Sequence, residues 1–231
     1  MKISCIIPAR SGSKGIPNKN IIDFCGKPLI AWTIMQALEV KEVTDVWVSS
    51  DDDNILDIAK QYGAKIIKRP YDISGDTATS ESAWLHAIDF IEERSECLID
   101  YVLAPQVTSP LRHSADFSNA ITKIKADDSD SLLSVAVIED FFIWKQESKG
   151  HPKSVNYDYK NRKPRQQIEK TYLENGSFYL FKPKALKNSD NRLSGDISLF
   201  VMDRYKMFQI DNIEDIELSS IIMKGYGLNK I

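Results

Sequence analysis

The stretch that decides the fold is residues 3–20, ISCIIPARSGSKGIPNKN. Its opening run, residues 3–7, is mostly apolar and leads into Pro8, which predicts a short buried strand. The loop that follows, residues 9–20, contains two glycines, two serines and three cations, Arg10, Lys14 and Lys19. Glycines let backbone N–H groups approach an anion closely, and the cations neutralise its charge. A buried strand that ends in such a loop indicates an α/β domain with a phosphate site; a solvated basic turn is the alternative.

Strands and helices alternate through the first part of the chain. Further apolar runs predict strands at 45–49, 64–68, 101–104 and 131–138. Helical patterns with caps separate them at 28–38, 50–62, 79–94 and 114–125. This alternation predicts a mostly parallel, doubly wound, Rossmann-like sheet with helices on both faces. Ligands bind such sheets at the carboxyl ends of the strands, so we expect three loops to share one edge: 9–20, 68–79 and 106–112.

The pattern changes between residues 139 and 172. This segment is aromatic and basic, lacks helical periodicity, and is interpreted as an inserted dimerisation arm or lid. After it, strand character at 176–181 and within 199–210 and an amphipathic helix at 212–223 complete the chain. The sequence therefore predicts a single domain over residues 1–231 with one insertion.

The composition is that of an ordinary globular protein of 231 residues, with 42% hydrophobic and 27% charged residues. A formal net charge of -3 argues against a nucleic-acid partner, because proteins that bind nucleic acid usually carry a basic excess. The three cysteines lack metal or disulfide spacing, which favours a reducing, cytoplasmic location. We expect neither a secretion signal nor a membrane span, because no apolar stretch is long enough for a span.

Three later segments also carry groups suited to chemistry. Residues 106–112, QVTSPLR, place an amide, two hydroxyls and a guanidinium after a strand, with helix capping as the alternative. Arg165 suits a carboxylate or phosphate, and Asn175-Gly176 is either part of a site or only a tight turn. Asp211 lies between a strand and a helix, where it either holds Mg²⁺ beside substrate phosphates or caps the helix.

These segments, in this order, resemble the acylneuraminate cytidylyltransferase family, which makes CMP-activated nonulosonic acids such as CMP-sialic acid. The resemblance extends over essentially the whole chain. The matching stretches are residues 7–15, 19–20, 26–29, 49–51, 68–70, 75–78, 106–112, 164–166, 175–176 and 210–211. The resemblance implies a nucleotidyltransferase fold and an enzyme that transfers CMP from CTP to a free sugar acid, releasing pyrophosphate.

The resemblance also implies a role for each matching residue. The catalytic cations on the triphosphate would be Arg10, Lys14 and Lys19. The nucleotide site, with Arg69 reading the cytosine, would comprise Ala9, Arg10, Ser13, Lys14, Asn20, Arg69, Asp76 and Ser80. The sugar site would comprise Gln106, Thr108, Ser109, Arg112, Lys145, Arg165, Gln166, Asn175 and Tyr179. Asp211 would hold Mg²⁺, with Mn²⁺ as the alternative, and the arm would exchange between the subunits of a homodimer.

Two features depart from the sialic-acid members of the family. Gln209 stands where those members often carry a second aspartate, so we expect one carboxylate at the metal. Residues 191–199 lack the adjacent phenylalanines that those members place around the N-acyl group. This difference points to another nonulosonic acid as acceptor, such as a legionaminic or pseudaminic acid.

Four alternative functions remain at the level of sequence. The nearest is a cytidylyltransferase for the octulosonic acid of lipopolysaccharide, which shares the nucleotide half. A sugar-1-phosphate nucleotidyltransferase is more distant, because such enzymes prefer a longer glycine-rich first loop. A non-catalytic nucleotide sensor and a nucleic-acid module complete the set. The first loop matches neither the GxxxxGK[ST] nor the GxGxxG pattern, so a P-loop or a dinucleotide site is not predicted.

Overall fold

Strand β1 (Ile3–Pro8) forms from the apolar run that opens the chain, and all but its last residue are buried. In this computed structural model, which describes residues 1–13, 15–95, 97–139, 141–148 and 150–230, β1 pairs in parallel with β4 (Asp45–Ser50) and β6 (Tyr101–Pro105). An interior strand of a parallel sheet is covered on both faces, which explains the continuous apolar run.

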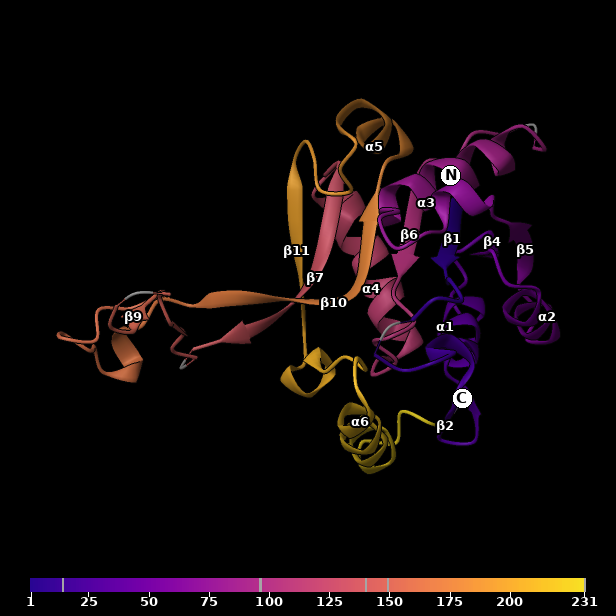
Figure 1. Ribbon diagram of the computed structural model, residues 1–231. Coiled ribbons are helices and arrows are strands. Elements are labelled where there is room, and N and C mark those ends of the chain that lie inside the picture. The colour runs from indigo at the N-terminus through magenta and orange to yellow at the C-terminus, as the bar shows by residue number, and fades with distance from the viewer. Residues whose placement is uncertain (14, 96, 140, 149, 231) are drawn as a thin grey trace.

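The main sheet has seven strands in the order β11-β7-β10-β6-β1-β4-β5 (Figure 1). Its remaining members are β5 (Lys65–Lys68), β7 (Ser131–Ile138), β10 (Thr171–Phe181) and β11 (Ile197–Met202). Strand β10 runs antiparallel to β6 and β7, and the other pairs are parallel. The prediction of a mostly parallel sheet is confirmed.

Helices cover both faces of this sheet, as predicted. One hydrophobic core receives residues from α1 (Leu29–Leu38), α2 (Asp53–Gln61), α4 (Ser114–Ala126) and α6 (Ile213–Gly225). The core on the opposite face receives residues from α3 (Ser80–Glu92) and α5 (Pro183–Ser189). No helix in the described part of the chain is long and apolar enough to cross a membrane.

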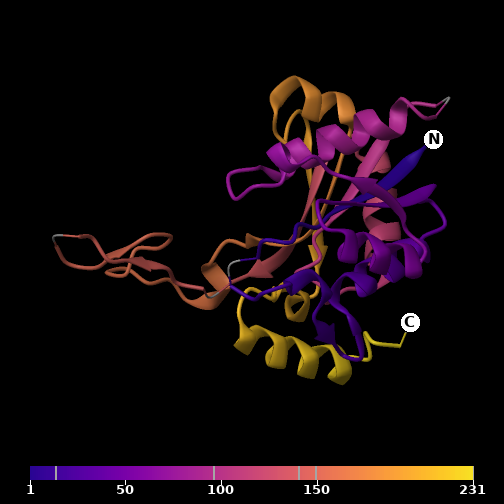
Figure 2. The ribbon, with the colours of Figure 1, turned by 45° about the vertical axis from the view of Figure 1, so that its right-hand side comes forward.

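The segment between β7 and β10 projects from the body as an arm in both ribbon views (Figures 1 and 2). It contains a small hairpin of β8 (Trp144–Lys145) and β9 (Lys153–Ser154) and a 3-10 turn, η3 (Arg165–Gln167). Aromatic contacts support it: Tyr157 packs 4.3 Å from Phe142 between ring centres, and its hydroxyl accepts from Nε1 of Trp144 at 2.9 Å. Ring packing within the arm replaces a helical core there.

Short elements complete the fold near the edge that carries the site. A hairpin of β2 (Asp23–Phe24) and β3 (Lys27–Pro28) turns at residues 25–26, after the 3-10 turn η1 (Lys19–Ile21). Two more 3-10 turns are η2 (Tyr71–Ile73) and η4 (Arg204–Met207).

Two predictions about the C-terminal part need correction, and a third becomes more precise. Of the one or two strands expected within residues 199–210, one is present, β11, which ends at Met202 and is followed by η4. Strand β10 begins at Thr171 instead of residue 176, because its first residues pair with the end of β7. Helix α6 is not amphipathic: Met223 packs into the core, while Ile213 and Ile221 are 74% and 62% exposed.

Candidate active site

The loops after β1 and β5 meet at the carboxyl edge of the sheet. The guanidinium of Arg10 donates to the carbonyl oxygen of Gly75 at 2.8 Å and lies 3.4 Å from the carboxylate of Asp76. On its other side, the loop is closed by Asn20, whose Nδ2 donates to the carbonyl of Arg10 at 2.9 Å. Ala9 joins the same edge, because its N–H donates to the carbonyl of Ser49 at 3.0 Å. The predicted convergence of these loops is confirmed.

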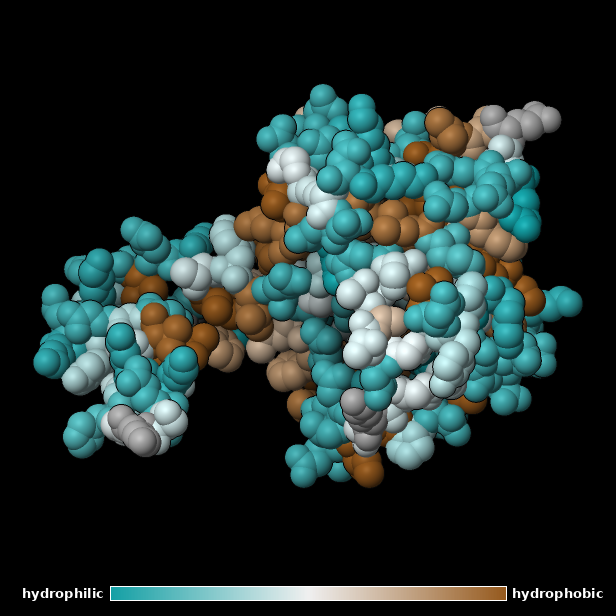
Figure 3. Space-filling view, turned by 45° about the horizontal axis from the view of Figure 1, so that its top comes forward, coloured by the Kyte–Doolittle hydropathy of each residue, from teal (hydrophilic) through white to brown (hydrophobic). Residues whose placement is uncertain are grey.

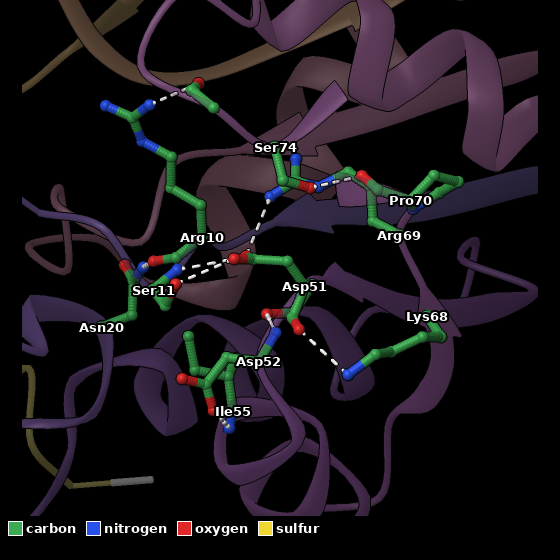
Figure 4. Close-up of polar contacts among 12 residues, drawn as sticks. Arg10, Ser11, Asn20, Asp51, Asp52, Ile55, Lys68, Arg69, Pro70 and Ser74 are labelled. Carbon is green, nitrogen blue, oxygen red and sulfur yellow. Dashed lines mark hydrogen bonds and ion pairs between the residues drawn. The ribbon is translucent and has the colours of Figure 1, made fainter. Parts of the chain in front are cut away.

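Asp51, directly after β4, fixes the first loop in place (Figure 4). Its carboxylate accepts from the backbone N–H of Ser11 at 3.2 Å and from the hydroxyl of Ser11 at 2.8 Å. The same carboxylate lies 3.9 Å from the guanidinium of Arg69. The sequence predicted capping at residues 50–52 but no place for Asp51 in the binding site, although a carboxylate at the end of a strand on this edge was a usable signal.

Arg69 is a strongly buried cation at this edge, with 6% of its surface exposed. Burial lowers its pKa, the charge of Asp51 counteracts that effect, and Arg10 adds to it. Its Nε and Nη2 nevertheless have no hydrogen-bond acceptor within the described chain. Because buried donors without acceptors are costly, these two nitrogens are the groups here most in need of a ligand.

Four of the predicted nucleotide residues line one pocket of about 270 Å³: Arg10, Asn20, Arg69 and Ser80. Thr79 also lines it and caps α3 by accepting from the N–H of Ser82 at 3.1 Å. The pocket therefore combines guanidinium, amide and hydroxyl groups at the start of a helix, where the helix dipole favours negative charge. Such a set suits a polar heterocycle and its attached anionic chain.

A second group of charges lies where the first loop meets the C-terminal segment. Nζ of Lys19 lies 2.9 Å from Oδ1 of Asp211, and the side chains are 14% and 67% exposed. Asp211 does not cap α6, so the helix-cap alternative for this residue is wrong. The cap is Asn212, whose side chain accepts from the N–H of Asp215, while the carboxylate of Asp215 accepts from the N–H of Asn212. The carboxylate of Asp211 is thus available to Lys19 and to a ligand.

The segment that carries Asp211 is anchored from two sides. The N–H of the fully buried Ile210 donates to the carbonyl of Thr108 at 2.8 Å, which ties it to the loop after β6. A Cβ atom on Gly15 would overlap the carbonyl oxygen of Asp211, so glycine is required at this close approach. Residues 106–112 are thereby joined to the same edge as the first loop.

The side chains at this edge fit a magnesium ion that is shared with a phosphate ligand. Within residues 1–13, 15–95, 97–139, 141–148 and 150–230, no three metal-binding side chains gather into a complete protein site. Mg²⁺ is commonly held by one or two carboxylates together with substrate phosphates and water. Asp211, an exposed carboxylate beside a cationic loop, would be the protein ligand of such an ion.

Four residues expected to contact a sugar are instead buried and bonded within the protein. Arg112 is fully buried; its guanidinium donates to the carbonyls of Gln106 and Ser177 and to the hydroxyl of Thr33. Burial lowers the pKa of Arg112 to about 9. Arg112 stabilises the loop after β6, because it donates hydrogen bonds to backbone carbonyls that would otherwise be buried without a donor.

The other corrections have the same physical reason. Ser109 is 1% exposed and donates to the carbonyl of Gly176. Asn175 is 1% exposed, and its Oδ1 accepts from the hydroxyl of Ser134 at 2.6 Å. Tyr179 is 4% exposed, donates its hydroxyl to Glu174 and packs edge-on against Trp84; burial and Glu174 raise its pKa. In this structure the polar groups of these three residues bond to neighbouring side chains or backbone within the protein.

The remaining predicted residues divide between the edge and the arm. Gln106, Thr108 and Ser13 are partly exposed on loops of this edge. Lys145 and Gln166 are exposed on the arm, which projects from the body (Figure 2). Two other predicted site residues, Lys14 and the side chain of Arg165, lie outside the described part of the structure.

Comparisons with known proteins agree with this arrangement. A family model described as cytidylyltransferase matches residues 4–223. A pseudaminic acid cytidylyltransferase of Campylobacter jejuni is 35% identical over 97% of each chain. N-acylneuraminate cytidylyltransferase B of Danio rerio is 38% identical over 93% of this chain and 49% of its own length.

A solved structure of a CMP:2-keto-3-deoxy-manno-octonic acid synthetase complexed with CTP superposes with a TM-score of 0.73. It covers 98% of this chain and 100% of that one, at 16% identity, so it shows a shared fold. Together with the match of the family model to nearly the whole chain, these findings show that the chain belongs to the cytidylyltransferase family and is a nucleotidyltransferase.

Proposed function

We propose that this enzyme forms a CMP-nonulosonic acid and pyrophosphate from CTP and a free nonulosonic acid. The relatives named above as pseudaminic acid and N-acylneuraminate cytidylyltransferases support this acceptor class. The observation that carries the nucleotide assignment is Arg69, a buried guanidinium beside the pocket with two nitrogens that have no hydrogen-bond acceptor among the described residues. Cytosine offers two adjacent acceptors, its carbonyl oxygen and ring nitrogen, which complement a pair of N–H donors.

The first loop binds and orients the triphosphate. Arg10 and Lys19 neutralise its charge, and the loop itself is held by Asp51 and Asn20 before substrate arrives. The anomeric hydroxyl oxygen of the acceptor attacks the α-phosphorus and loses its proton to solvent. The bond from that phosphorus to the bridging oxygen breaks, and pyrophosphate leaves. Transfer of this kind depends mainly on in-line positioning and charge neutralisation. Asp211 would hold Mg²⁺, which supplies further charge neutralisation when bound.

The acceptor is placed in the nonulosonic class, with pseudaminic acid as the first candidate. A relative that covers 97% of each chain carries that name. The octulosonic synthetase shares only the fold at its level of identity, so an octulosonic acid is the weaker alternative.

Two copies of the chain are proposed to form a homodimer in the cytoplasm, with the arm reaching the neighbouring site. Exposed apolar side chains support a covered surface: β11 exposes Ile197, Leu199 and Val201, and the outer part of β10 exposes Tyr172 and Leu173. Figure 3 shows hydrophobic surface gathered where the arm meets the body. Patches of this kind on soluble proteins usually mark interaction sites. The free cysteines suit a reducing compartment.

The test is pyrophosphate release from CTP with a panel of acceptors: pseudaminic, legionaminic, sialic and octulosonic acids, and no acid. We expect release only when CTP and a nonulosonic acid are both present. If octulosonic acid were the only acid to support release from CTP, the enzyme would be an octulosonic acid cytidylyltransferase. Binding of CTP with no release for any acid would instead support a non-catalytic sensor.

A further inference from the structure

Two side-chain amides, Gln106 and Gln209, flank Gly176 at the irregularity in β10. Gly176 has a φ of +61°, and a Cβ atom placed on it would lie 2.5 Å from Nε2 of Gln209 and 3.4 Å from Oε1 of Gln106. Glycine at residue 176 therefore suits the positive φ and leaves room for the amide of Gln209, while a Cβ atom would only touch that of Gln106. The two amides come from segments about a hundred residues apart in sequence and meet across one backbone position.

Gln209 is oriented by a backbone carbonyl. Its Nε2 donates to the carbonyl oxygen of Asn175 at 3.0 Å. Since a carbonyl can only accept a hydrogen bond, the nitrogen end of the Gln209 amide must face Asn175. Its Oε1 and the second N–H of Nε2 remain available to other partners. Neither these groups nor the side-chain amide of Gln106 has a hydrogen-bond partner in the part of the chain that the structure describes, although both residues are partly exposed.

The position of this amide pair places it beside the reacting groups. Gln209 precedes Asp211 by two residues, across the buried anchor Ile210, and Gln106 directly follows β6. The edge thus runs from the nucleotide pocket through Lys19 and Asp211 to the amide pair. A ligand joined to the α-phosphate from the side opposite the nucleotide base would meet these amides next.

We infer that Gln209 is a specificity-determining residue that, with Gln106, binds neutral polar substituents of the acceptor, hydroxyl or acylamino groups. This inference rests on the proposed function. An amide carries no charge and offers both a donor and an acceptor, which matches such substituents. Mg²⁺ prefers a charged carboxylate to a neutral amide oxygen such as Oε1 of Gln209. Gln209 therefore selects the acceptor and does not hold the metal.

The experiment uses the full-length enzyme with whichever acid supports pyrophosphate release. Gln209→Ala is expected to raise the KM for the acceptor about tenfold while the KM for CTP stays within about twofold, since the lost hydrogen bonds are made to the acceptor alone. Gln209→Met, which keeps most of the side-chain volume, should give the same split. The matched control is Gln61→Ala, an exposed glutamine at the end of α2, which should change neither constant.

A second readout separates acceptor binding from metal binding. Electron paramagnetic resonance measures Mn²⁺ binding to the enzyme–CTP complex in the absence of acceptor. We expect the same Mn²⁺ affinity in Gln209→Ala as in the wild type. An unchanged acceptor KM in both Gln209 variants, or weakened Mn²⁺ binding in them, would overturn the inference. If Gln209→Ala does not fold, Gln209→Met decides the matter by the same readouts. Failure of the proposed function is distinct, because wild-type enzyme would then release no pyrophosphate with any nonulosonic acid.

Discussion

Arg10 and Lys19 belong to one loop, yet each is held by a different part of the chain. Arg10 is bound by the carbonyl of Gly75 and by Asp76 after β5, and Lys19 by Asp211 before α6. Charged donors that are oriented before substrate binds stabilise a transition state without a cost of reorganisation. Their partners thus hold both cationic side chains in position before a triphosphate binds.

Replacing either cation should slow the reaction far more than it weakens the fold. Arg10→Ala and Lys19→Ala are each expected to lower kcat with CTP about 100-fold or more, by analogy with the loss of one oxyanion donor. Steady-state pyrophosphate release measures this, with Lys60→Ala on the exposed face of α2 as control. Near-wild-type turnover in both variants would show that the first loop is not part of the active site.

Arg69 should decide which base is accepted. Arg69→Met removes the two donors that have no acceptor among the described residues, and a hydrogen bond to a charged group contributes about 1.5–3 kcal/mol. The preference for CTP over UTP, measured as a ratio of kcat/KM values, should therefore fall at least about tenfold. Arg94→Met, at the exposed end of α3, is the control. An unchanged base preference would show that Arg69 serves only to brace Asp51.

Asp211 should determine the response to magnesium. Asp211→Asn keeps the shape of the side chain but removes the charge that attracts the cation, so the Mg²⁺ concentration for half-maximal rate should rise about tenfold. A titration of pyrophosphate release against Mg²⁺ checks this, with the exposed Asp57→Asn on α2 as control. A titration identical to wild type would place the metal at other ligands.

At the scale of elements, a buried ion pair connects η4 to α4. Nζ of Lys206, which is 4% exposed, lies 2.9 and 3.0 Å from the two carboxylate oxygens of Asp116 and 3.1 Å from Asp203. Burial alone would lower the pKa of Lys206, but hydrogen bonds and charge from Asp116 and Asp203 outweigh it and raise the pKa. The pair fixes the segment that leads to Gln209 and Asp211.

Lys206→Met should destabilise the fold, because it leaves Asp116 buried without its cation. A loss of about 3 kcal/mol is expected, which lowers Tm by about 6–12 °C in a protein of this size. Because the folded pKa of Lys206 lies above its unfolded value of 10.5, the stabilisation is complete below that pH and declines above it. Urea unfolding should therefore show a smaller wild-type–variant difference above that pH. An exposed-lysine control, Lys41→Met, should unfold like wild type.

The elements that sequence predicted well are those with local signals. Buried runs such as residues 3–7 and the cap at Asp52 define strands and helix starts from neighbouring residues. The antiparallel insertion of β10 between β6 and β7 depends on pairing across the chain, which no local pattern encodes. The burial of Arg112 was equally hidden, because one of its carbonyl partners, Ser177, lies in β10, 65 residues along the chain.

The nucleotide side of the site was accessible to sequence because its residues follow parallel strands. Arg10, Asn20, Arg69 and Ser80 converge as that rule requires. The acceptor side was less accessible, since it depends on the bend at Gly176 and on the non-strand path of residues 203–211. Gln209 was noticed there only as a missing carboxylate, whereas its contacts define it as an amide beside Gln106.

At the scale of the whole molecule, the body and the arm differ in how they are supported. The body has a core on each face of its sheet, whereas the arm depends on a few ring contacts. Strand β11 lies at the free edge of the sheet and exposes a row of apolar side chains on one face. Exposed apolar edges are sites of association, which makes this strand the place to test assembly.

A charge on this row should separate the subunits without unfolding them. Val201→Glu is expected to convert a particle of twice the 26.2 kDa chain mass into a monomer, because Val201 is 48% exposed and a buried carboxylate at an interface is costly. Light scattering at micromolar concentration measures the mass. Ile213→Glu, an equally drastic change at a 74% exposed position on α6, should leave the dimer intact. A wild-type monomer at that concentration would rule out the proposed dimer, and a dimer that survives in Val201→Glu would move its interface away from β11.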